Sequence, residues 1–555
     1  MLLLFKVPNP LIKLIMSCVA SPSISVLLNG CQLDPLLPSR GIRQGDPLSP
    51  YLFIMCMEML SFLIEDKCSS QLWDSLKVSR SGIAFSHLMF ADDLMLFTKA
   101  DLKNCASIKD VLDSFCEMFG QKVSLAKSRV YFSPNVSPHT REELCEVLGF
   151  RSTPNLGNYL GFSIKHPGSL SQDFDFIIQR VQGKLVGWIA SFLSMASKVV
   201  LAQAITTTVP AYVMQGVLLP ARVHNKLDKL TRDFIWGSSI EKQKLHLVNW
   251  EKAVRPKENG GLGIRAAKQK NLSLTAKLCW RFKNSKGELW AETLKRKYVR
   301  RGRNDRKNFS RTWAAIKKSE SLMQHDSHWL IGSNSSLFFW YDKWHKLGPL
   351  RNCIQGPLPL IEEELSVSQV VDHGRWNLSV LSFIFPSSLL DVLLATPLRF
   401  LSSREDVLSW EGNSLGKFDT KSAYKLALKT EVQLPLFEGR WIWKLNTLPS
   451  IKVFLWKCAH SSLPVKGMLF SRGVSENPWC ALCQCEDESL LHTFRDCLVV
   501  RNFWILVGAL LIQPDFFSKR CDEWLYSNSC STVAGPNCFV RWNSFFLMGI
   551  WSIWL

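Results

Sequence analysis

The stretch HLMFADDLMLF, His87 to Phe97, places two adjacent acidic residues inside an apolar run that holds no lysine or arginine. Moving an isolated carboxylate into apolar surroundings is costly, so such a group normally loses its charge, finds a cation or binds a metal ion. The pieces His87–Ala91 and Leu94–Phe97 are each long enough for a strand, and the Asp92–Asp93 connection between them predicts a tight hairpin. Two interpretations remain: the aspartates only form the turn, as Asp often does, or they hold divalent metal ions at the hairpin tip.

A second segment upstream, RQGDPLSP, begins at Arg43 and adds chemistry to the acidic pair. Gly45 permits close backbone approach, and Arg43 and Gln44 are able to contact a phosphate or a base. Two metal ions held close together stabilise the attacking and leaving oxygens of a phosphoryl transfer. Nucleotidyl transfer is therefore the chemistry that the acidic pair suits best.

Turn and cap signals predict the secondary structure around these motifs. Ser23–Asn29 predicts a strand that ends at an Asn-Gly turn. Ser49, which precedes a proline, predicts the start of a helix whose free backbone amides its hydroxyl caps. A mostly apolar helix is expected to follow over roughly Tyr51–Asp66.

The composition predicts a globular protein with an anionic partner. At 555 residues the chain is long enough for about three or four domains. A hydrophobic fraction of 47%, with 21 Trp and 33 Phe, argues against a disordered chain. The formal net charge of +20 predicts a polyanion as partner, most simply nucleic acid.

The longest apolar runs fall short of the roughly 20 residues that a spanning helix needs, so no membrane partner is expected. The 17 cysteines are too few for a disulfide scaffold and fit a reducing compartment.

The chain changes character along its length. The first 165 residues alternate helical and strand-like pieces, which predicts a mixed unit of helices and strands. Residues 166–400 are richer in helical pattern, and we interpret their basic stretch Leu294–Lys307 as a solvated helix face rather than a targeting or binding signal. From about 405 to 510, Trp-rich helical pieces lead into a cluster of Cys and His residues.

That cluster, WCALCQCEDESLLHTFRDC, has the spacing of a zinc site. A Cys-x2-Cys pair is followed by a His-x4-Cys pair, and three thiolates with one imidazole can close a tetrahedral zinc site. The four expected ligands are Cys480, Cys483, His492 and Cys497. The alternatives are chance placement or reduced cysteines in a core, but this segment is polar and offers them no apolar surroundings. Cys485 is a spare thiol that could compete for a ligand position.

Four motifs in order resemble the reverse transcriptase of LINE-type, non-LTR retrotransposons, especially those of plants. They are RQGDPLSPYLF, MFADDLMLF, GQKVSLAKS at Gly120–Ser128 and YLGFSI at Tyr159–Ile164. The resemblance implies a polymerase palm in which Asp92 and Asp93 are catalytic and hold Mg²⁺. It also implies that Gln44 and Gly45 lie near the incoming nucleotide and the template, and that a lysine lies near the triphosphate. The expected substrate-binding residues are Arg43, Gln44, Gly45 and Lys127.

The sequence also departs from the family pattern. Phe90 stands for the usual aromatic before Ala-Asp-Asp, and Ser124 occupies a position where asparagine is usual. The family's first catalytic aspartate lies on a strand upstream of the Arg-Gln-Gly-Asp helix, whereas the only acidic residue before Gly45 is Asp34, beside a proline in a loop-like segment. We therefore expect a truncated palm with little or no polymerase activity, because such catalysis is mostly positioning and charge stabilisation. The alternatives are a non-catalytic nucleic-acid-binding relic and a relic that does not fold stably.

The resemblance continues beyond the palm to about residue 510. Segments up to FFWYDKW, Phe338–Trp344, resemble the helical part that follows the palm, and GKFDTKSAYKLA and its successors resemble the zinc-binding module of plant LINE-like proteins. The module's resemblance implies the same four zinc ligands. The expected fold class is α+β, with a partial palm of antiparallel sheet and helices at 1–165, a helical thumb or connector at 166–400, a small zinc-binding module at 405–510 and a C-terminal helical tail at 511–555.

The resemblance further implies the partners and the location of the protein. The expected partners are an RNA template, a DNA primer and, in an active enzyme, deoxynucleoside triphosphates. The expected cofactors are Mg²⁺ and Zn²⁺. Because such elements act on chromosomal DNA, the nucleus is the expected location, with the cytoplasm as the alternative.

Overall fold

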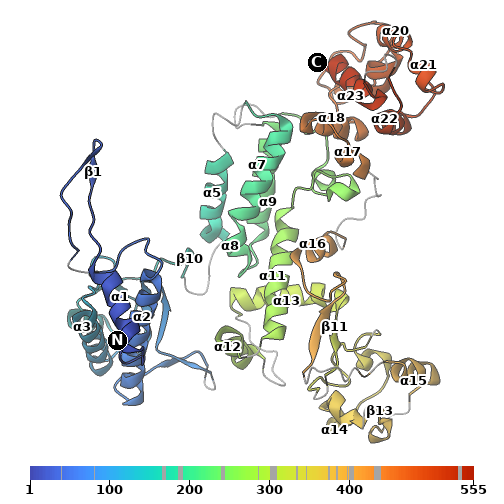
Figure 1. The fold of residues 1–555 in the computed structure, drawn as a ribbon. Helices are drawn as coiled ribbons and strands as arrows, with labels where there is room; N and C mark the ends of the chain where they lie inside the picture. The colour runs from blue at the N-terminus through green and yellow to red at the C-terminus, as the bar shows by residue number, and fades with distance from the viewer. Residues whose placement is uncertain are drawn as a thin grey trace. The chain divides into compact units, whose positions relative to one another are not determined.

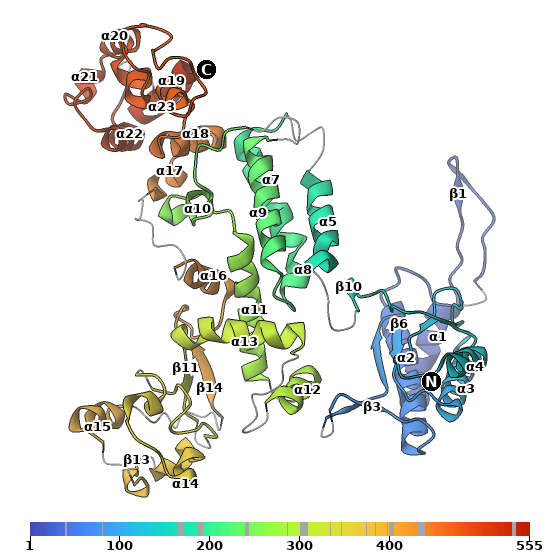
Figure 2. The ribbon, with the colours of Figure 1, turned by 180° about the vertical axis from the view of Figure 1, so that it is seen from behind.

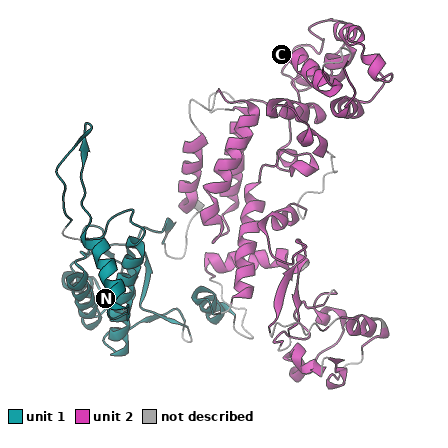
Figure 3. Ribbon diagram, viewed as in Figure 1, with its two compact units in different colours: residues 1–169, 286–306 teal, residues 170–285, 307–555 magenta. Residues whose placement is uncertain are grey.

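The computed structural model is built mainly of helices, with small sheets between them (Figure 1). It describes residues 1–38, 41–79, 82–164, 171–185, 192–238, 244–285, 287–299, 309–332, 335–345, 347–372, 375–382, 385–396, 398, 405–429, 439–535 and 540–555. Helices and sheets are both present, as the α+β prediction requires. The sheets are small, because within the described residues every sheet has two strands. The chain divides into two compact units, unit 1 at 1–169 with 286–306 and unit 2 at 170–285 with 307–555 (Figure 3).

Unit 1 interleaves helices with short hairpins. Its helices are α1 (Asn9–Ala20), α2 (Ser49–Ser69), α3 (Leu102–Phe119), α4 (Pro138–Leu148) and α12 (Leu289–Tyr298). Its strands are β1 (Leu27–Leu28), β2 (Cys31–Gln32), β3 (Leu76–Lys77), β4 (Ala84–Phe85), β5 (His87–Phe90), β6 (Asp93–Leu96), β7 (Arg129–Val130), β8 (Arg151–Ser152), β9 (Asn158–Tyr159) and β10 (Phe162–Ser163). All strand pairs are antiparallel except β7 with β8, which are parallel. The basic stretch Leu294–Lys307 begins in α12, and its residues 300–307 lie outside the described part of the chain.

The first hairpin confirms the predicted Asn-Gly turn. Leu28 of β1 pairs with Cys31 of β2, so Asn29 and Gly30 form the two-residue connection. Their φ angles are 50° and 84°, and this left-handed backbone is why Asn-Gly is favoured in such turns. The regular strand is shorter than the predicted Ser23–Asn29, because before Leu27 the pairing reduces to a hydrogen bond from the Leu33 amide to the Val26 carbonyl oxygen and an isolated bridge of Ile24 with Leu36.

Helix α2 begins at Ser49 as predicted and extends to Ser69, three residues beyond the predicted end. The prediction that the Ser49 hydroxyl caps the helix amides is wrong. That hydroxyl instead donates to the Arg43 carbonyl oxygen at 2.6 Å, and the Asp46 carboxylate accepts from the Leu48 amide at 2.8 Å. Ser49 is itself the first helical residue, so the capping acceptor must come from a residue before it.

The core of unit 1 lies between α2, α3, α4 and one face of the β5–β6 hairpin. Its buried residues are Leu60, Ile64, Trp73, Cys105, Ile108, Val111, Leu112, Phe115, Leu144 and Leu148. The α3 members recur at helical spacing, so this helix presents a single apolar face. Met89, Leu94 and Leu96 of the hairpin pack against that core. The core therefore fixes which face of the hairpin points outward.

In its described residues, unit 2 is helical, with two small sheets. Its α-helices are α5 (Asp175–Leu185), α7 (Met195–Thr208), α8 (Ala211–Met214), α9 (Ala221–Trp236), α10 (Trp250–Ala253), α11 (Ala267–Asn284), α13 (Arg311–Asp326), α14 (Leu360–Glu363), α15 (Ser387–Leu394), α16 (Thr420–Lys429), α17 (Arg440–Lys444), α18 (Pro449–Ala459), α19 (Lys466–Ser471), α20 (Leu498–Leu506), α21 (Ala509–Ile512), α22 (Cys521–Cys530) and α23 (Trp542–Trp554). The shorter helical turns are η1 (Ser171–Phe174), η2 (Lys257–Asn259), η3 (Leu350–Cys353), η4 (Val367–Val370), η5 (Leu378–Val380) and η6 (His492–Asp496). Strand β11 (Ser327–Leu330) pairs with β14 (Val407–Trp410), and β12 (Val371–Asp372) pairs with β13 (Arg375–Trp376).

Several apolar clusters are found among the described residues of unit 2, including the following three. Helices α5, α7 and α9 lie side by side (Figure 1, Figure 2), and the inner faces of α7 and α9 share a core with α10 and Trp456 of α18. A second core is built around Trp340 and Trp344, both buried, as the aromatic spacing of FFWYDKW predicts. The third spans Ile442–Ile550, so the helices after residue 510 share the core that holds the cysteine cluster. No helix in the described ranges combines the length and apolarity needed to cross a membrane.

Candidate functional sites

The acidic pair lies on a hairpin, as predicted, but the connection is shifted by one residue. Phe90 of β5 pairs with Asp93 of β6, so the two-residue connection is Ala91–Asp92 and not Asp92–Asp93. The open end of the hairpin fixes this register, because the Phe97 amide donates to the Ser86 carbonyl oxygen at 2.8 Å. The indole of buried Trp73 also donates to the Phe97 carbonyl oxygen at 3.0 Å. Turn propensity alone does not reveal these anchors.

The two aspartates are exposed, and they differ in backbone position. Asp92 is in the turn, where the preceding Ala91 has a φ of 51°, a left-handed conformation that is uncommon for a non-glycine residue. Asp93 is the first residue of β6, and alternation along the strand places it on the outer face with Phe90, which is 61% exposed. Both carboxylates are therefore accessible to a ligand at the tip of the hairpin.

A histidine ties the hairpin to helix α2. The Nε2 atom of His87 lies 3.2 Å from the Ser61 hydroxyl on α2, and its Nδ1 atom lies 2.9 Å from the Ser86 hydroxyl. Burial lowers the pKa of His87, while the charges of Glu65 and Glu58 act in the opposite direction. The ring is therefore suited to a neutral, positioning contact at the base of the hairpin.

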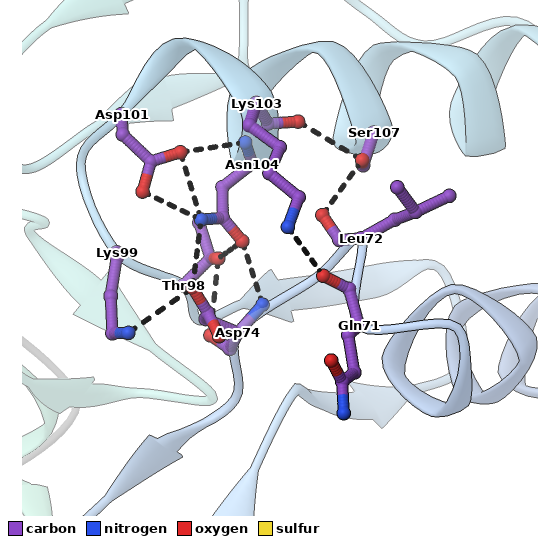
Figure 4. Close-up of polar contacts among 9 residues, drawn as sticks. All are labelled: Gln71, Leu72, Asp74, Thr98, Lys99, Asp101, Lys103, Asn104 and Ser107. Carbon is purple, nitrogen blue, oxygen red and sulfur yellow. Dashed lines mark hydrogen bonds and ion pairs between the residues drawn. The ribbon is translucent and has the colours of Figure 1, made fainter.

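A polar cluster joins the exit of the hairpin to helix α3 (Figure 4). Asp101 caps α3 by accepting from the Asn104 amide at 2.8 Å. The buried Asn104 side chain then accepts from the Thr98 hydroxyl and from the Asp74 amide, both at 2.7 Å. A hydrogen bond from Lys99 lowers the pKa of Asp74. Sequence reasoning missed this cluster, although Asp101 before an amphipathic run is a recognisable cap signal.

Tyr159 of the YLGFSI motif lies within electrostatic reach of one residue of the acidic pair. Burial raises the pKa of the Tyr159 phenol, and the negative charge of Asp93 raises it further. The hairpin of β9 and β10 therefore lies within electrostatic reach of Asp93. Among the described residues, no third acidic side chain groups with Asp92 and Asp93 as a set of potential metal ligands.

The residues expected to bind substrate are exposed. They are Arg43, Gln44, Gly45 and Lys127. Gly45 has a φ of 91° and open space around the position of a Cβ, so its backbone conformation, not a close contact within the protein, requires glycine. Lys127 lies in a turn, and its own backbone amide donates to the Ser124 carbonyl oxygen at 3.1 Å. In the described part of the chain the side chains of Arg43, Gln44 and Lys127 form no hydrogen bond or ion pair with Asp92 or Asp93.

The four cysteine-cluster residues come together as predicted. One ligand atom from each of Cys480, Cys483, His492 and Cys497 lies within 4.8 Å of the others. The Cys480 and Cys497 sulfurs are 3.9 Å apart, and the Cys483 sulfur lies 3.2 Å from Nε2 of His492. Backbone N–H groups, first that of Cys485, lower the pKa of Cys483 to about 6. Three sulfurs and one ring nitrogen at these separations fit a tetrahedral zinc ion, and the thiolate form that the metal requires is favoured at Cys483.

A π-helical turn, η6, explains the His-x4-Cys spacing. The Cys497 amide donates to the His492 carbonyl oxygen at 2.8 Å, an i to i+5 bond that brings both ligands to the same side. Cys485 lies outside the ligand group, because its exposed thiol donates to the Cys483 carbonyl oxygen at 2.9 Å. The cluster therefore has four ligands, with the fifth thiol directed to the backbone.

Two parts of this chain match known protein families. Residues 2–203 match the family described as reverse transcriptase (RNA-dependent DNA polymerase), and residues 418–504 match the family described as zinc-binding in reverse transcriptase. An Arabidopsis thaliana protein named as a candidate ribonuclease H protein is 32% identical over 391 residues, which are 69% of this chain and 63% of that protein. An uncharacterized mitochondrial protein of the same plant is 46% identical over 67 residues, 12% of this chain and 55% of the relative.

A more distant match comes from an insect. The retrovirus-related Pol polyprotein from a type-2 retrotransposable element of Drosophila melanogaster is 27% identical over 124 residues, 22% of this chain and 10% of that protein. The chain spans 63% or less of the length of each of these three relatives.

Proposed function

Because the chain belongs to the reverse transcriptase family and carries that family's zinc-binding module, we propose that it is a LINE-type RNA-directed DNA polymerase-like protein with impaired activity. The observation that carries this proposal is the β5–β6 hairpin, which exposes Asp92 and Asp93 at its tip. In this proposal 1–165 is a partial palm, 166–400 a helical thumb or connector, 405–510 the zinc-binding module and 511–555 a helical tail.

The proposed reaction is attack of a primer 3′-hydroxyl on a deoxynucleoside triphosphate, templated by RNA, with release of pyrophosphate. Asp92 and Asp93 would hold Mg²⁺, which is usually bound by one or two carboxylates together with substrate phosphates. When bound, Mg²⁺ neutralises charge that develops on the transferred phosphoryl group. Gln44 and Gly45 would lie along the nucleotide and template, with Arg43 and Lys127 contacting phosphate. Activity is proposed to be weak because, among the described residues, only two carboxylates gather at the tip.

Zinc is proposed as a structural cofactor of the C-terminal module. Cys480, Cys483, His492 and Cys497 supply four ligands, which closes a tetrahedral site and leaves no position for a reacting water. Cys480, His492 and Cys497 are buried, which suits a site that stabilises a fold. We also propose a nuclear location, with a cytoplasmic one as the alternative, because the substrate would be chromosomal DNA.

A primer-extension assay tests the polymerase proposal. The full chain would be incubated with an RNA template, a DNA primer, deoxynucleoside triphosphates and Mg²⁺. We expect weak templated incorporation that falls to the level of heat-inactivated protein in Asp92→Asn and Asp93→Asn. Asp34→Asn is the matched control, since Asp34 is an exposed acid outside the hairpin, and it should keep the wild-type signal. Robust synthesis would contradict impaired activity, and incorporation that survives both hairpin substitutions would contradict the assigned site.

The second candidate function is nucleic-acid binding without catalysis, and a groove in unit 2 favours it. An open groove of about 590 Å³ lies between α5 and α9, and it is lined by Asp175, Ile178, Gln179, Arg222, Asn225, Lys226 and Lys229. Lys226 and Lys229 recur on the groove-facing side of α9, and within the described residues neither forms an ion pair. Two such ammonium groups on one helix face suit the phosphates of a nucleic-acid backbone.

Salt-dependent binding tests the second candidate. Replacing both Lys226 and Lys229 by Ala should reduce the magnitude of the slope of log K against log salt by about 2, because each phosphate contact contributes about 0.9. The control pair, Lys277→Ala with Lys318→Ala, removes the same charge from exposed positions outside the groove. Equal slopes of log K against log salt for the two double variants would mean that the overall charge of the chain, and not the groove, accounts for the binding. Templated incorporation separates the two candidates, since only the polymerase-like protein shows it.

A further inference from the structure

The imidazole of His492 is held from both sides. Its Nε2 atom faces the sulfur of Cys483 at 3.2 Å, and its Nδ1 atom lies 3.0 Å from Oε2 of Glu486. The His492 side chain is 6% exposed, whereas that of Glu486 is 71% exposed. The carboxylate thus reaches from the surface to the one ring nitrogen that does not face the sulfurs.

The backbone around Glu486 fixes this arrangement. The Cys480 amide donates to the Glu486 carbonyl oxygen at 2.9 Å, and the Gln484 amide donates to the Cys480 carbonyl oxygen at 3.0 Å. Gln484 has a φ of 55°, so the loop between the ligand pairs turns sharply. One residue further on, Asp487 pairs with Trp479 through an isolated bridge. This backbone therefore holds Glu486 where its side chain meets the His492 ring. The side chains of Asp487 and Glu488 do not meet that ring.

Those two neighbours have different surroundings. The Glu488 carboxylate accepts from the Lys466 amide at 3.1 Å, at the start of α19. The Asp487 side chain is exposed, and in the described part of the chain it contacts none of the four ligands. The run Glu486, Asp487 and Glu488 thus offers three acids that differ in their contact with His492.

We propose that Glu486 is a positioning residue for zinc, accepting the Nδ1–H of His492 so that the Nε2 lone pair is presented to the metal. A neutral imidazole carries its proton on one nitrogen only, and a proton on Nε2 would prevent binding there. A carboxylate acceptor at Nδ1 selects the competent tautomer, fixes the ring plane and raises the basicity of the ligand nitrogen. This inference rests on the proposed zinc binding by the four ligands and adds a fifth residue to that site.

The primary experiment measures zinc affinity of the full chain by competition with a chromophoric chelator. Outer carboxylates of this kind typically contribute 10- to 100-fold to metal affinity, so Glu486→Ala should weaken zinc binding by about 10-fold or more. Glu486→Gln retains an oxygen acceptor and should restore part of the loss. Asp487→Asn, the matched control for charge, should stay within about 2-fold of wild type, because Asp487 does not touch the ring.

A double-mutant cycle separates positioning from a general effect on the loop. In the background His492→Cys the fourth ligand is a thiolate, which needs no tautomer, so Glu486→Ala should then have little effect on zinc affinity. An equal loss in both backgrounds would overturn the inference, as would a Glu486→Ala affinity equal to that of Asp487→Asn. If His492→Cys itself fails to bind zinc, the two Glu486 variants of the otherwise wild-type chain decide. Glu486→Gln should then bind zinc more tightly than Glu486→Ala, and equal affinities would overturn the inference. Failure of the wild-type chain to bind zinc would instead overturn the proposed zinc site.

Discussion

One buried amide side chain, that of Asn271 in α11, satisfies four polar groups in unit 2. Its oxygen accepts from the Leu219 amide at 2.7 Å and lies 2.9 Å from Nε2 of His224. Its nitrogen donates to the carbonyl oxygens of Met214 and Val217, both at 2.9 Å. The side chain is fully buried and uses its complete hydrogen-bonding capacity. The segment between α8 and α9 therefore depends on this one residue.

Replacing Asn271 by Ala should lower the free energy of unfolding of unit 2 by about 3 to 5 kcal/mol. The substitution leaves several buried donors and acceptors without partners, and each costs about 1 to 3 kcal/mol. Chemical denaturation followed by tryptophan fluorescence measures the change. Asn284→Ala is the control on the same helix, because Asn284 is exposed and its side chain donates to the Trp280 carbonyl oxygen of its own helix. A loss for Asn271→Ala no larger than that of the control would contradict the assignment.

The neighbouring residue, Lys270, predicts a pH dependence of stability. Lys270 is 4% exposed, and its ammonium group donates to the carbonyl oxygens of Thr206 and Thr207 near the end of α7. Burial, helped by the charge of Arg265, lowers the pKa of Lys270 to about 7. The unfolded chain keeps an ordinary pKa near 10.5. Between these two values the unfolded state binds more protons, so stability rises with pH from about 7 to about 10.5.

Comparison with Lys270→Met isolates that contribution. The free energy of unfolding of the wild type should rise relative to the variant by up to about 1.4 kcal/mol per pH unit above pH 7. Below pH 7 both states of the wild type carry the proton, and the difference should be flat. Denaturation curves under reducing conditions at pH 6, 7, 8 and 9 measure this trend. Parallel pH profiles for the two proteins would show that Lys270 stays charged in the fold.

At the scale of single elements, the β5–β6 hairpin stores local backbone strain at Ala91. A non-glycine residue in the left-handed region costs about 1 to 2 kcal/mol, and glycine costs about 0.5 to 1 kcal/mol through the unfolded state. Ala91→Gly should therefore stabilise the hairpin by about 0.5 kcal/mol. Hydrogen exchange of the β5 and β6 amides measures the opening free energy. Ala84→Gly in β4 is the matched control, with the opposite sign expected, since Ala84 lies in an ordinary strand.

Local sequence rules predicted the elements whose causes are local. The Asn29-Gly30 turn, the start of α2 and the spacing of the zinc ligands are each determined by a few adjacent residues, and the structure agrees with them. The register of the β5–β6 hairpin could not be predicted in this way, because Trp73 and Ser86 fix it from outside the motif. The contact between Glu486 and His492 was also missed, since it depends on the fold of the loop between the ligand pairs. The predicted Ser49 cap failed as well, although its actual partner, the Arg43 carbonyl oxygen, lies only six residues away. What these failures share is that the partner is set by the path of the folded backbone and not by residue type and spacing.

At the scale of the whole molecule, the zinc ligands and the last helix share one apolar core. Cys480 and Cys497 are at most 3% exposed and belong to the same cluster as Trp542, Phe546 and Ile550. Trp504 and Trp542 pack in that cluster with their ring centroids 6.0 Å apart. A metal that holds Cys480 and Cys497 together would therefore stabilise helices well beyond residue 510.

Removing the metal should consequently loosen α23 as well as the ligand loops. We expect chelation of zinc from the full chain to reduce hydrogen-exchange protection in α20 and α23, because binding free energy of a structural metal is also folding free energy. Helix α3 of unit 1 is the internal reference and should keep its protection, since it belongs to a separate core. Cys497→Ser should reproduce the effect without chelator, and Cys485→Ser, outside the ligand group, should not. Full protection of α23 in the metal-free protein would mean that the aromatic core alone is sufficient to hold this helix.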